Sequence, residues 1–340
     1  MFDIEDYDQI FPYGSYAEGL RRDIAECQST LGGRTFFERL LELLNIKCLL
    51  ISIGRKIYPP NGDDGLRELH NRICEAPITL HYKHCLIFYL LRDLSPHYKT
   101  SPEWATQFAT SVHLETRFWT FIEGIWELDH LQFDNAVGHL THPSIIPTFP
   151  DEILLTLVNR RHHQLSTMSE TDILPLAYYN CVKPPLATDA VRQPFVRYLA
   201  ARNVTETYYW IRARPEHEHR QLLEALVEQT LDHRAWGAGD PSDIESIYPR
   251  QEKAVELVGL PFSEEEEEWV EKFLTEGKGR TLKGAEDTVL MRKIATGRLH
   301  SFVAGKSKQG KAHHGVDWKT LKEGVKKGLG PREGEEGFKV

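Results

Sequence analysis

Apolar residues recur at helical spacing through most of this sequence, and that pattern limits the fold more than any other feature. One run places Phe133, Ala136, Val137 and Leu140 at positions i, i+3, i+4 and i+7, where they would share one face of a helix. Pro143 ends this run, because proline has no N–H with which to continue a helix. Two further runs of the same design, each soon followed by a proline, are residues 174–181 and 204–211.

Turn-forming residues separate these runs at short intervals, and no segment shows the sustained alternation typical of a strand. Short helices joined by short loops tend to form antiparallel pairs, and stacked pairs form α-solenoids. The sequence has no strict repeat period, so the repeats would be irregular. With 340 residues, 41% of them hydrophobic, the chain can fill a sizeable core. We therefore predict an all-α fold, an irregular α-solenoid of antiparallel helical hairpins.

The net charge of −9 is distributed unevenly along the chain. Residues 277–340 hold 15 Lys and Arg against 7 Asp and Glu, whereas residues 1–276 hold 26 against 43. Within the acidic part, residues 245–276 are poorer in apolar side chains, so we expect thinner packing there. A solvated helix is predicted over 263–275, because Ser263 suits an N-cap and five glutamates follow it.

These shifts in composition divide the sequence into four parts. We predict an N-terminal arm at 1–33, a helical domain at 34–276, a partner-binding helical segment at 277–304 and a flexible, disordered basic tail at 305–340. Within the tail, residues 317–327 are expected to form a transient helix.

We expect neither secretion nor a membrane span. The first residues are acidic, where a signal peptide needs positive charge before an apolar run. The most apolar stretch, residues 46–53, contains Lys47 and is too short to cross a bilayer. The five cysteines are odd in number and widely spaced, which indicates free thiols in a reducing compartment.

Several motifs resemble chemical sites, and each has a simpler interpretation. Residues 305–312 match part of a phosphate-binding loop, but Ala312 lacks the hydroxyl that would hold Mg²⁺. Histidine pairs occur along the chain without a thiolate pair, and their scatter argues against zinc. Asp129, His130 and Asp134 could form an acid–base cluster, although capping of helix ends suits them better. We predict no catalytic residue, cofactor, metal or small-molecule substrate, while convergence of distant residues in space stays open.

Three consecutive aromatic residues, Tyr208, Tyr209 and Trp210, cannot all face one core from a helix, so one of them could be exposed. Because aromatic residues and arginine are enriched at the centres of interfaces, we predict a docking patch. The alternative is burial on two sides between neighbouring helices. The patch comprises Tyr209, Trp210, Arg212 and Arg214.

A second candidate docking segment combines apolar residues with cations that could meet an acidic partner groove. The alternative is that this segment closes the solenoid. Its residues are Asp287, Leu290, Met291, Arg292, Ile294, Arg298 and Leu299.

The segment 118–137 reads FWTFIEGIWELDHLQFDNAV, and with its flanks it resembles the helical domain of the ELYS family of nuclear pore assembly proteins. The resemblance covers roughly residues 35–300 and is closest to the short fungal type. The residues that carry it are mainly structural, which argues for fold and lineage rather than for a reaction. They are Trp119, Gly124, Trp126, Leu128, Asp129, His130, Phe133, Ala136, Leu140 and Pro143.

The resemblance implies a non-enzymatic structural component of the nuclear pore complex, located at the nuclear envelope. Such a component would dock to the Y-shaped complex of outer-ring nucleoporins and support pore assembly and the transport of mRNA and protein. The basic tail also suggests weak contact with DNA or chromatin, although residues 277–281 only approximate an AT-hook. Other hypotheses are an adaptor in a vesicle coat or a proteasome-lid-like particle, a chromatin-binding protein, and a helical enzyme that uses the histidines.

Overall fold

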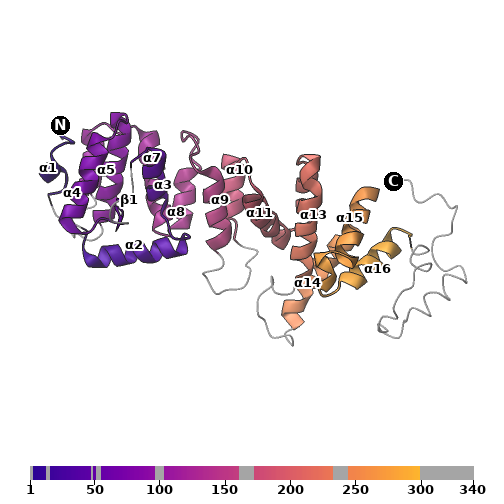
Figure 1. Cartoon of the computed structure of the whole chain (residues 1–340). Helices are drawn as coiled ribbons and strands as arrows, with labels where there is room; N and C mark the ends of the chain where they lie inside the picture. The colour runs from indigo at the N-terminus through magenta and orange to yellow at the C-terminus, as the bar shows by residue number, and fades with distance from the viewer. Residues whose placement is uncertain are drawn as a thin grey trace, which may run out of the picture. The chain divides into compact units, whose positions relative to one another are not determined.

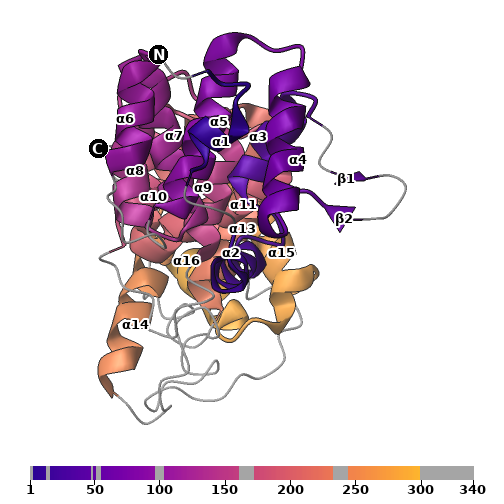
Figure 2. The ribbon, with the colours of Figure 1, turned by 90° about the vertical axis from the view of Figure 1, so that its left-hand side faces the viewer.

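A computed structural model describes most of the chain, and most of the described residues lie in helices (Figure 1). The all-α prediction is therefore confirmed. The strands that are described are short: β1 (Leu49–Leu50) pairs antiparallel with β2 (Arg55–Lys56). Figure 2 shows this pair projecting to the side of α4 (Gly62–Glu75). The described residues are 3–12, 16–46, 49–50, 55–95, 103–160, 172–232 and 244–298, with the backbone alone for 49–50, 55–56, 103 and 244–251.

The chain forms two compact units, and their division falls within α11 (Asp189–Arg202). Unit 1 runs to residue 191 without residues 166–170, and unit 2 comprises the rest. The boundaries predicted after residues 33, 276 and 304 stay predictions, and the tail 305–340 lies outside the described residues. Besides α4, the helices of unit 1 are α1 (Tyr7–Ile10), α2 (Glu18–Thr30), α3 (Phe36–Leu43), α5 (Leu80–Leu94), α6 (Glu103–Ser111), α7 (Thr116–Asp129), α8 (Phe133–Leu140), α9 (Pro150–Asn159) and α10 (Leu174–Val182).

Helix α5 is the central element of unit 1. It is apolar on nearly all sides from Cys85 to Leu91, and this whole stretch is buried. A helix that is hydrophobic all round needs neighbours on several sides. Helices α4, α6 and α7 supply them by packing directly against α5.

Helices α7 and α8 form a tight hairpin, as the run ending at Pro143 predicted. Gly124 of α7 lies so close to α8 that a Cβ atom there would stand 2.7 Å from Cγ of Leu140. Ala136 of α8 is fully buried. The absence of a side chain at Gly124 therefore lets α7 and α8 approach closely at Leu140.

In unit 2 the helices that follow α11 surround one apolar core. Two of the helical runs expected from the sequence coincide with helices, α10 in unit 1 and α12 (Val204–Arg212) in unit 2. Successive helices also pack as pairs, as a solenoid requires. The other elements of unit 2 are α13 (Glu216–Leu231), α14 (Ile244–Gly259), α15 (Glu264–Thr275), the 3₁₀ helix η3 (Lys278–Thr281) and α16 (Ala285–Ala295).

The helix predicted over 263–275 is confirmed as α15. Ser263 accepts a hydrogen bond from the backbone N–H of Glu266, whose side chain accepts one from the N–H of Ser263, so both N-terminal donors are satisfied. The expectation of thin packing in this region was wrong, because Val270 and Leu274 are buried in the core of unit 2. Few apolar residues suffice here since they fall on one face of the helix.

Candidate functional site

A buried aspartate, Asp93, lies near the C-terminal end of α5 in the centre of unit 1. Its carboxylate accepts hydrogen bonds from the hydroxyls of Tyr16 (2.8 Å) and Tyr58 (2.6 Å) and from the indole N–H of Trp126 (2.8 Å). Burial raises the pKa of Asp93, while nearby His130 and the three hydrogen bonds act in the opposite direction. This carboxylate therefore links residues that are far apart in the sequence.

The second buried aspartate, Asp129, ends α7 and caps the N-terminus of α3. Its two oxygens accept hydrogen bonds from the backbone N–H groups of Phe36 (2.6 Å) and Phe37 (2.9 Å), and Oδ2 also accepts the hydroxyl of Tyr89 (2.9 Å). A negative charge at a helix N-terminus is favourable because the helix dipole is positive there. Burial is the largest influence on this carboxyl and raises the pKa of Asp129 to about 7.

His130 joins the two ends of this network. Its Nδ1 lies 2.8 Å from the carbonyl oxygen of Trp126, which can only accept, so Nδ1 carries a proton. Its Nε2 lies 3.4 Å from Oδ1 of Asp93. The imidazole ring therefore lies between the backbone of α7 and the carboxylate of Asp93.

This arrangement favours capping over acid–base catalysis for Asp129 and His130. Both carboxylates are sealed from solvent, with Asp93 fully buried and Asp129 at 2% exposure. A substrate would have to displace the packing of α3 or α5 to reach them. Tyr16, Tyr58 and Asp93 were not predicted from the sequence as members of the network. The available signal was an acidic residue inside an otherwise apolar helix.

The remaining residues that carried the family resemblance are mostly in the hairpin core. Leu128, Ala136 and Leu140 are buried, and the ring of Trp119 meets Phe88 edge-on at 5.6 Å. Phe133 is partly buried, and Pro143 is exposed beyond the end of α8. Most of these side chains therefore lie in the core of the hairpin.

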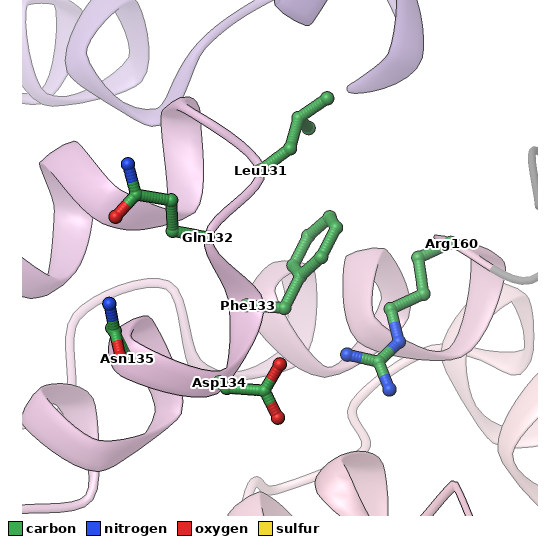
Figure 3. A pocket seen from close by; sticks show the side chains of 6 residues that line it. All are labelled: Leu131, Gln132, Phe133, Asp134, Asn135 and Arg160. Carbon is green, nitrogen blue, oxygen red and sulfur yellow. The ribbon is translucent and has the colours of Figure 1, made fainter.

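A hollow of about 310 Å³ lies at the turn between α7 and α8. Figure 3 shows the ring of Phe133 and the side chain of Arg160 extending toward it, with Asp134 nearby. The Arg160 guanidinium lies 5.3 Å from the ring centre of Phe133 and is paired with Asp172. The guanidinium of Arg160, which lines this hollow, is thus already paired within the fold. The predicted cluster of Asp129, His130 and Asp134 is not assembled around it, since the first two side chains point into the core.

In unit 2, the three consecutive aromatic residues of α12 have different environments. Tyr208 is fully buried, Tyr209 is 57% exposed, and Trp210 is partly buried with its ring edge-on to Phe195 at 5.7 Å. The exposed ring lies on the helix face opposite the core. Tyr209 is therefore the residue of the predicted patch that is placed to meet a partner.

The two arginines of the patch are engaged within unit 2. Arg212 donates to the hydroxyl of Tyr208 at 3.0 Å, and Arg214 donates to Glu218 at 3.1 Å while its guanidinium lies over the ring of Trp210. The side chain of Arg212 remains 47% exposed, against 21% for Arg214. Tyr209 and Arg212 thus form the accessible part of the patch.

Comparison with known proteins agrees with the hairpin geometry. A family model described as ELYS, nuclear pore complex assembly, matches residues 34–277. The chain belongs to the ELYS family. It is also similar to a Schizosaccharomyces pombe (strain 972) protein named uncharacterized protein ely5, with 24% identity over 230 residues that make up 67% of this chain and 69% of the relative.

The ELYS match begins just before α3, whose N-terminus Asp129 caps, and ends after α15. It therefore includes the α7–α8 hairpin and the aromatic residues of α12. The ELYS family has a structural role in the assembly of the nuclear pore complex. Membership of this family implies the same general role for the chain. Helix α16 lies beyond the matched residues.

Arg292 of α16 is buried and holds unit 2 together. Its guanidinium donates to Glu267 and to the carbonyl oxygens of Leu257, Val258 and Leu260 at the end of α14. A cation is favourable at a helix C-terminus, where free carbonyls accumulate. Arg292 thus caps α14 instead of extending toward a partner. The other residues of this predicted segment divide by exposure: Asp287, Met291, Ile294 and Arg298 are exposed, Leu290 is partly buried, and Leu299 lies outside the described residues.

The segment that approximates an AT-hook is folded into unit 2. Residues 278–281 form η3, and Gly279 is buried against the ring of Phe273, with only 2.5 Å between Cε1 and the position of an added Cβ. Glycine is therefore needed here for packing. The basic loop at 305–312 lies outside the described residues.

The described part of the chain was also searched for a metal site and a membrane span. It contains no group of three or more His, Cys, Asp or Glu side chains that could hold a metal ion. Among its helices, none combines the length and the apolar character needed to cross a bilayer.

Proposed function

We propose that this chain is a non-enzymatic structural component of the nuclear pore complex, located at the nuclear envelope. In this role it docks to the Y-shaped complex of outer-ring nucleoporins and supports pore assembly and nucleocytoplasmic transport. The observation that carries the proposal is the ELYS match over residues 34–277.

The use of polar residues within the matched region supports a scaffold. Asp93 and Asp129 accept their hydrogen bonds from distant parts of unit 1, and Arg292 donates to the end of α14 from just beyond the match. Buried charges of this kind fix how helices pack, because each is satisfied in one arrangement. A rigid surface of packed helices is what a docking protein needs.

Tyr209 and Arg212 are the proposed centre of the docking surface. Tyrosine and arginine are the residue types that contribute most to binding energy at interfaces. Tyr209 presents its ring to solvent without a role in the core, since the adjacent Tyr208 fills the core position. A partner could therefore bury the ring without disturbing unit 2.

Localisation and co-purification test the proposed role. A tagged chain is expected to form a ring at the nuclear envelope and to co-purify with outer-ring nucleoporins. A cytosolic distribution with vesicle-coat or proteasome components among the stable partners would refute it. A distribution that follows chromatin without nucleoporins would favour the basic tail as the functional part.

A point substitution tests the docking surface separately. Tyr209→Ala is expected to reduce co-purified nucleoporins roughly tenfold, the effect of losing one interface anchor. The matched control is Ile146→Ala, which removes an even more exposed apolar side chain, at 76%, from unit 1. Equal recovery of nucleoporins with both variants would exclude Tyr209 from the interface.

A further inference from the structure

Helix α16 carries apolar residues on two faces, and unit 2 buries one of them. Figure 1 shows α16 beside α15, and α16 packs against both α14 and α15. The face toward these helices consists of Ala285, Thr288, Val289 and Arg292, all of which are buried. The second apolar face, which we name the α16 stripe, consists of Leu290, which is partly buried, Met291, which is 50% exposed, and Ile294, which is 41% exposed.

The α16 stripe has the character of a contact surface. Leu290, Met291 and Ile294 stand at positions i, i+1 and i+4, so their side chains are neighbours on the helix surface. A surface helix usually carries polar residues on the side away from the core. Exposed apolar residues that are grouped, rather than scattered singly, mark interaction sites.

Unit 2 presents the α16 stripe on a firmly held helix. On the buried side, Arg292 donates hydrogen bonds to Glu267 and to the carbonyl oxygens at the end of α14. On the flank, the ammonium group of Lys293 is paired with Glu271 of α15. Since these contacts already order α16, an association through the stripe has little ordering cost at this helix.

Charges at the two ends of α16 indicate which occupant fits the stripe. Glu286 and Asp287 are exposed in the first turn, whereas Arg298 is exposed just beyond the C-terminal end. The stripe is therefore acidic at its start and basic at its end. Such a surface is complementary to a second copy of itself, provided that the two helices run antiparallel and opposite charges meet. A two-fold axis perpendicular to the helix produces this antiparallel arrangement.

The positions along α16 are compatible with such an axis. Asp287, Met291 and Ile294 are four and three residues apart, which places them on one side of the helix. An axis that passes between residues 292 and 293 sets Met291 opposite Ile294 of the second copy, and the reverse. The same axis sets Asp287 opposite Arg298 of the second copy. Each apolar side chain thus meets an apolar one, and each charge meets its opposite.

We propose that the α16 stripe is the interface of a two-fold symmetric homodimer, in which the α16 helices of two copies pack antiparallel. The interface is small, so the dimer is weak and forms as the chain becomes concentrated. This inference concerns the isolated chain and stands whether or not the proposed role at the nuclear pore is correct.

Analytical ultracentrifugation of the purified full-length chain tests the proposal. The average mass is expected to rise from that of one chain toward that of two between roughly 1 and 300 µM, the range of a weak interface. Met291→Glu places a charge in the interface and should raise the dissociation constant of the dimer roughly tenfold or more. Leu43→Glu is the matched control, because it places the same charge at a 56% exposed apolar position of α3 in unit 1 and should leave that constant unchanged.

A charge exchange tests the antiparallel orientation. Asp287→Arg and Arg298→Asp each bring like charges together twice in the symmetric dimer, so each should raise the dissociation constant roughly threefold or more. The double variant restores opposite charges and should return the constant to that of the unaltered chain. All four positions that are changed in unit 1 and unit 2 are exposed, and unchanged circular dichroism verifies that the variants are folded.

Two results would overturn the proposed dimer: a chain that stays monomeric over the whole concentration range, or self-association that Met291→Glu leaves as strong as Leu43→Glu does. Self-association that the double charge variant fails to restore would contradict the antiparallel pairing of α16 with its copy.

Discussion

Replacing Gly124 by alanine adds one methyl group where α7 meets α8. The new Cβ would lie 2.7 Å and 2.9 Å from Cγ and Cδ2 of Leu140, and 3.1 Å from Cβ of His139. Carbon atoms in contact normally stay about 3.5–4.0 Å apart. Leu140 is 5% exposed and has little room to withdraw, so the hairpin itself has to open.

Two opposing effects set the size of the change. Alanine is the better helix former, which stabilises the folded chain by about 1 kcal/mol relative to glycine. Overpacking of a close contact costs about 1–3 kcal/mol. Gly124→Ala is therefore expected to lower the free energy of unfolding of unit 1 by about 0–2 kcal/mol. Gly138→Ala is the matched control in the same hairpin, because nothing lies within 4 Å of its added Cβ, and it should raise that free energy by about 1 kcal/mol.

Urea denaturation of the full-length chain, followed by hydrogen exchange in peptides from α7 and α8, measures both variants. Peptide resolution is needed because two compact units need not unfold together. The informative quantity is the difference between the variants, expected to be about 1–3 kcal/mol with Gly138→Ala the more stable. Equal stabilisation by both substitutions would refute the close approach of α7 to α8.

Other substitutions test the buried polar groups. Burial raises the pKa of Asp129 to about 7, above the ordinary value, so the folded chain binds the extra proton. Its unfolding free energy should fall as pH rises from about 4 to 7, by at most about 1.4 kcal/mol per pH unit, and urea titrations of Asp129→Asn should lack this part of the slope. Arg292→Met should cost about 3–5 kcal/mol and speed exchange at the end of α14, whereas loss of the more exposed ion pair in Lys293→Met should cost less than about 1 kcal/mol in the same assay. Tyr208→Phe removes a hydroxyl that bonds Glu266 and should cost about 1–2 kcal/mol in urea denaturation, while Tyr209→Phe should change stability by less than about 0.5 kcal/mol.

Helix positions were predictable because they depend on local patterns. The spacing of Phe133 to Leu140 and the N-cap at Ser263 each specified a helix within a few residues of its observed bounds. The exposure of one of the three adjacent aromatic rings was also predictable, since a helix cannot direct Tyr208 and Tyr209 toward the same side. Which ring would be exposed was not, because that depends on where α14 and α15 pack.

The partners of the buried charges could not be inferred from the sequence. Asp129 was expected to cap a helix end, but the helix that it caps begins at Phe36, more than 90 residues earlier. Arg292 was expected at a docking surface, and its position on the buried side of α16 follows from contacts with α14. Such pairings join segments with no sequence relationship to each other.

The sequence by itself determined the all-α class, the positions of most helices and the family. These depend on hydrophobic periodicity, capping residues and the hairpin residues, all of which can be recognised within short segments of the chain. Tertiary structure alone decided which polar side chains are buried and hydrogen-bonded within the fold and which side chains remain exposed to solvent. The physical reason is that an isolated charge is too costly to bury, so Asp93, Asp129 and Arg292 each need a donor or acceptor brought from a distant helix. Only the packed units specify those partners, and they thereby leave Tyr209, Met291 and Ile294 on the surface.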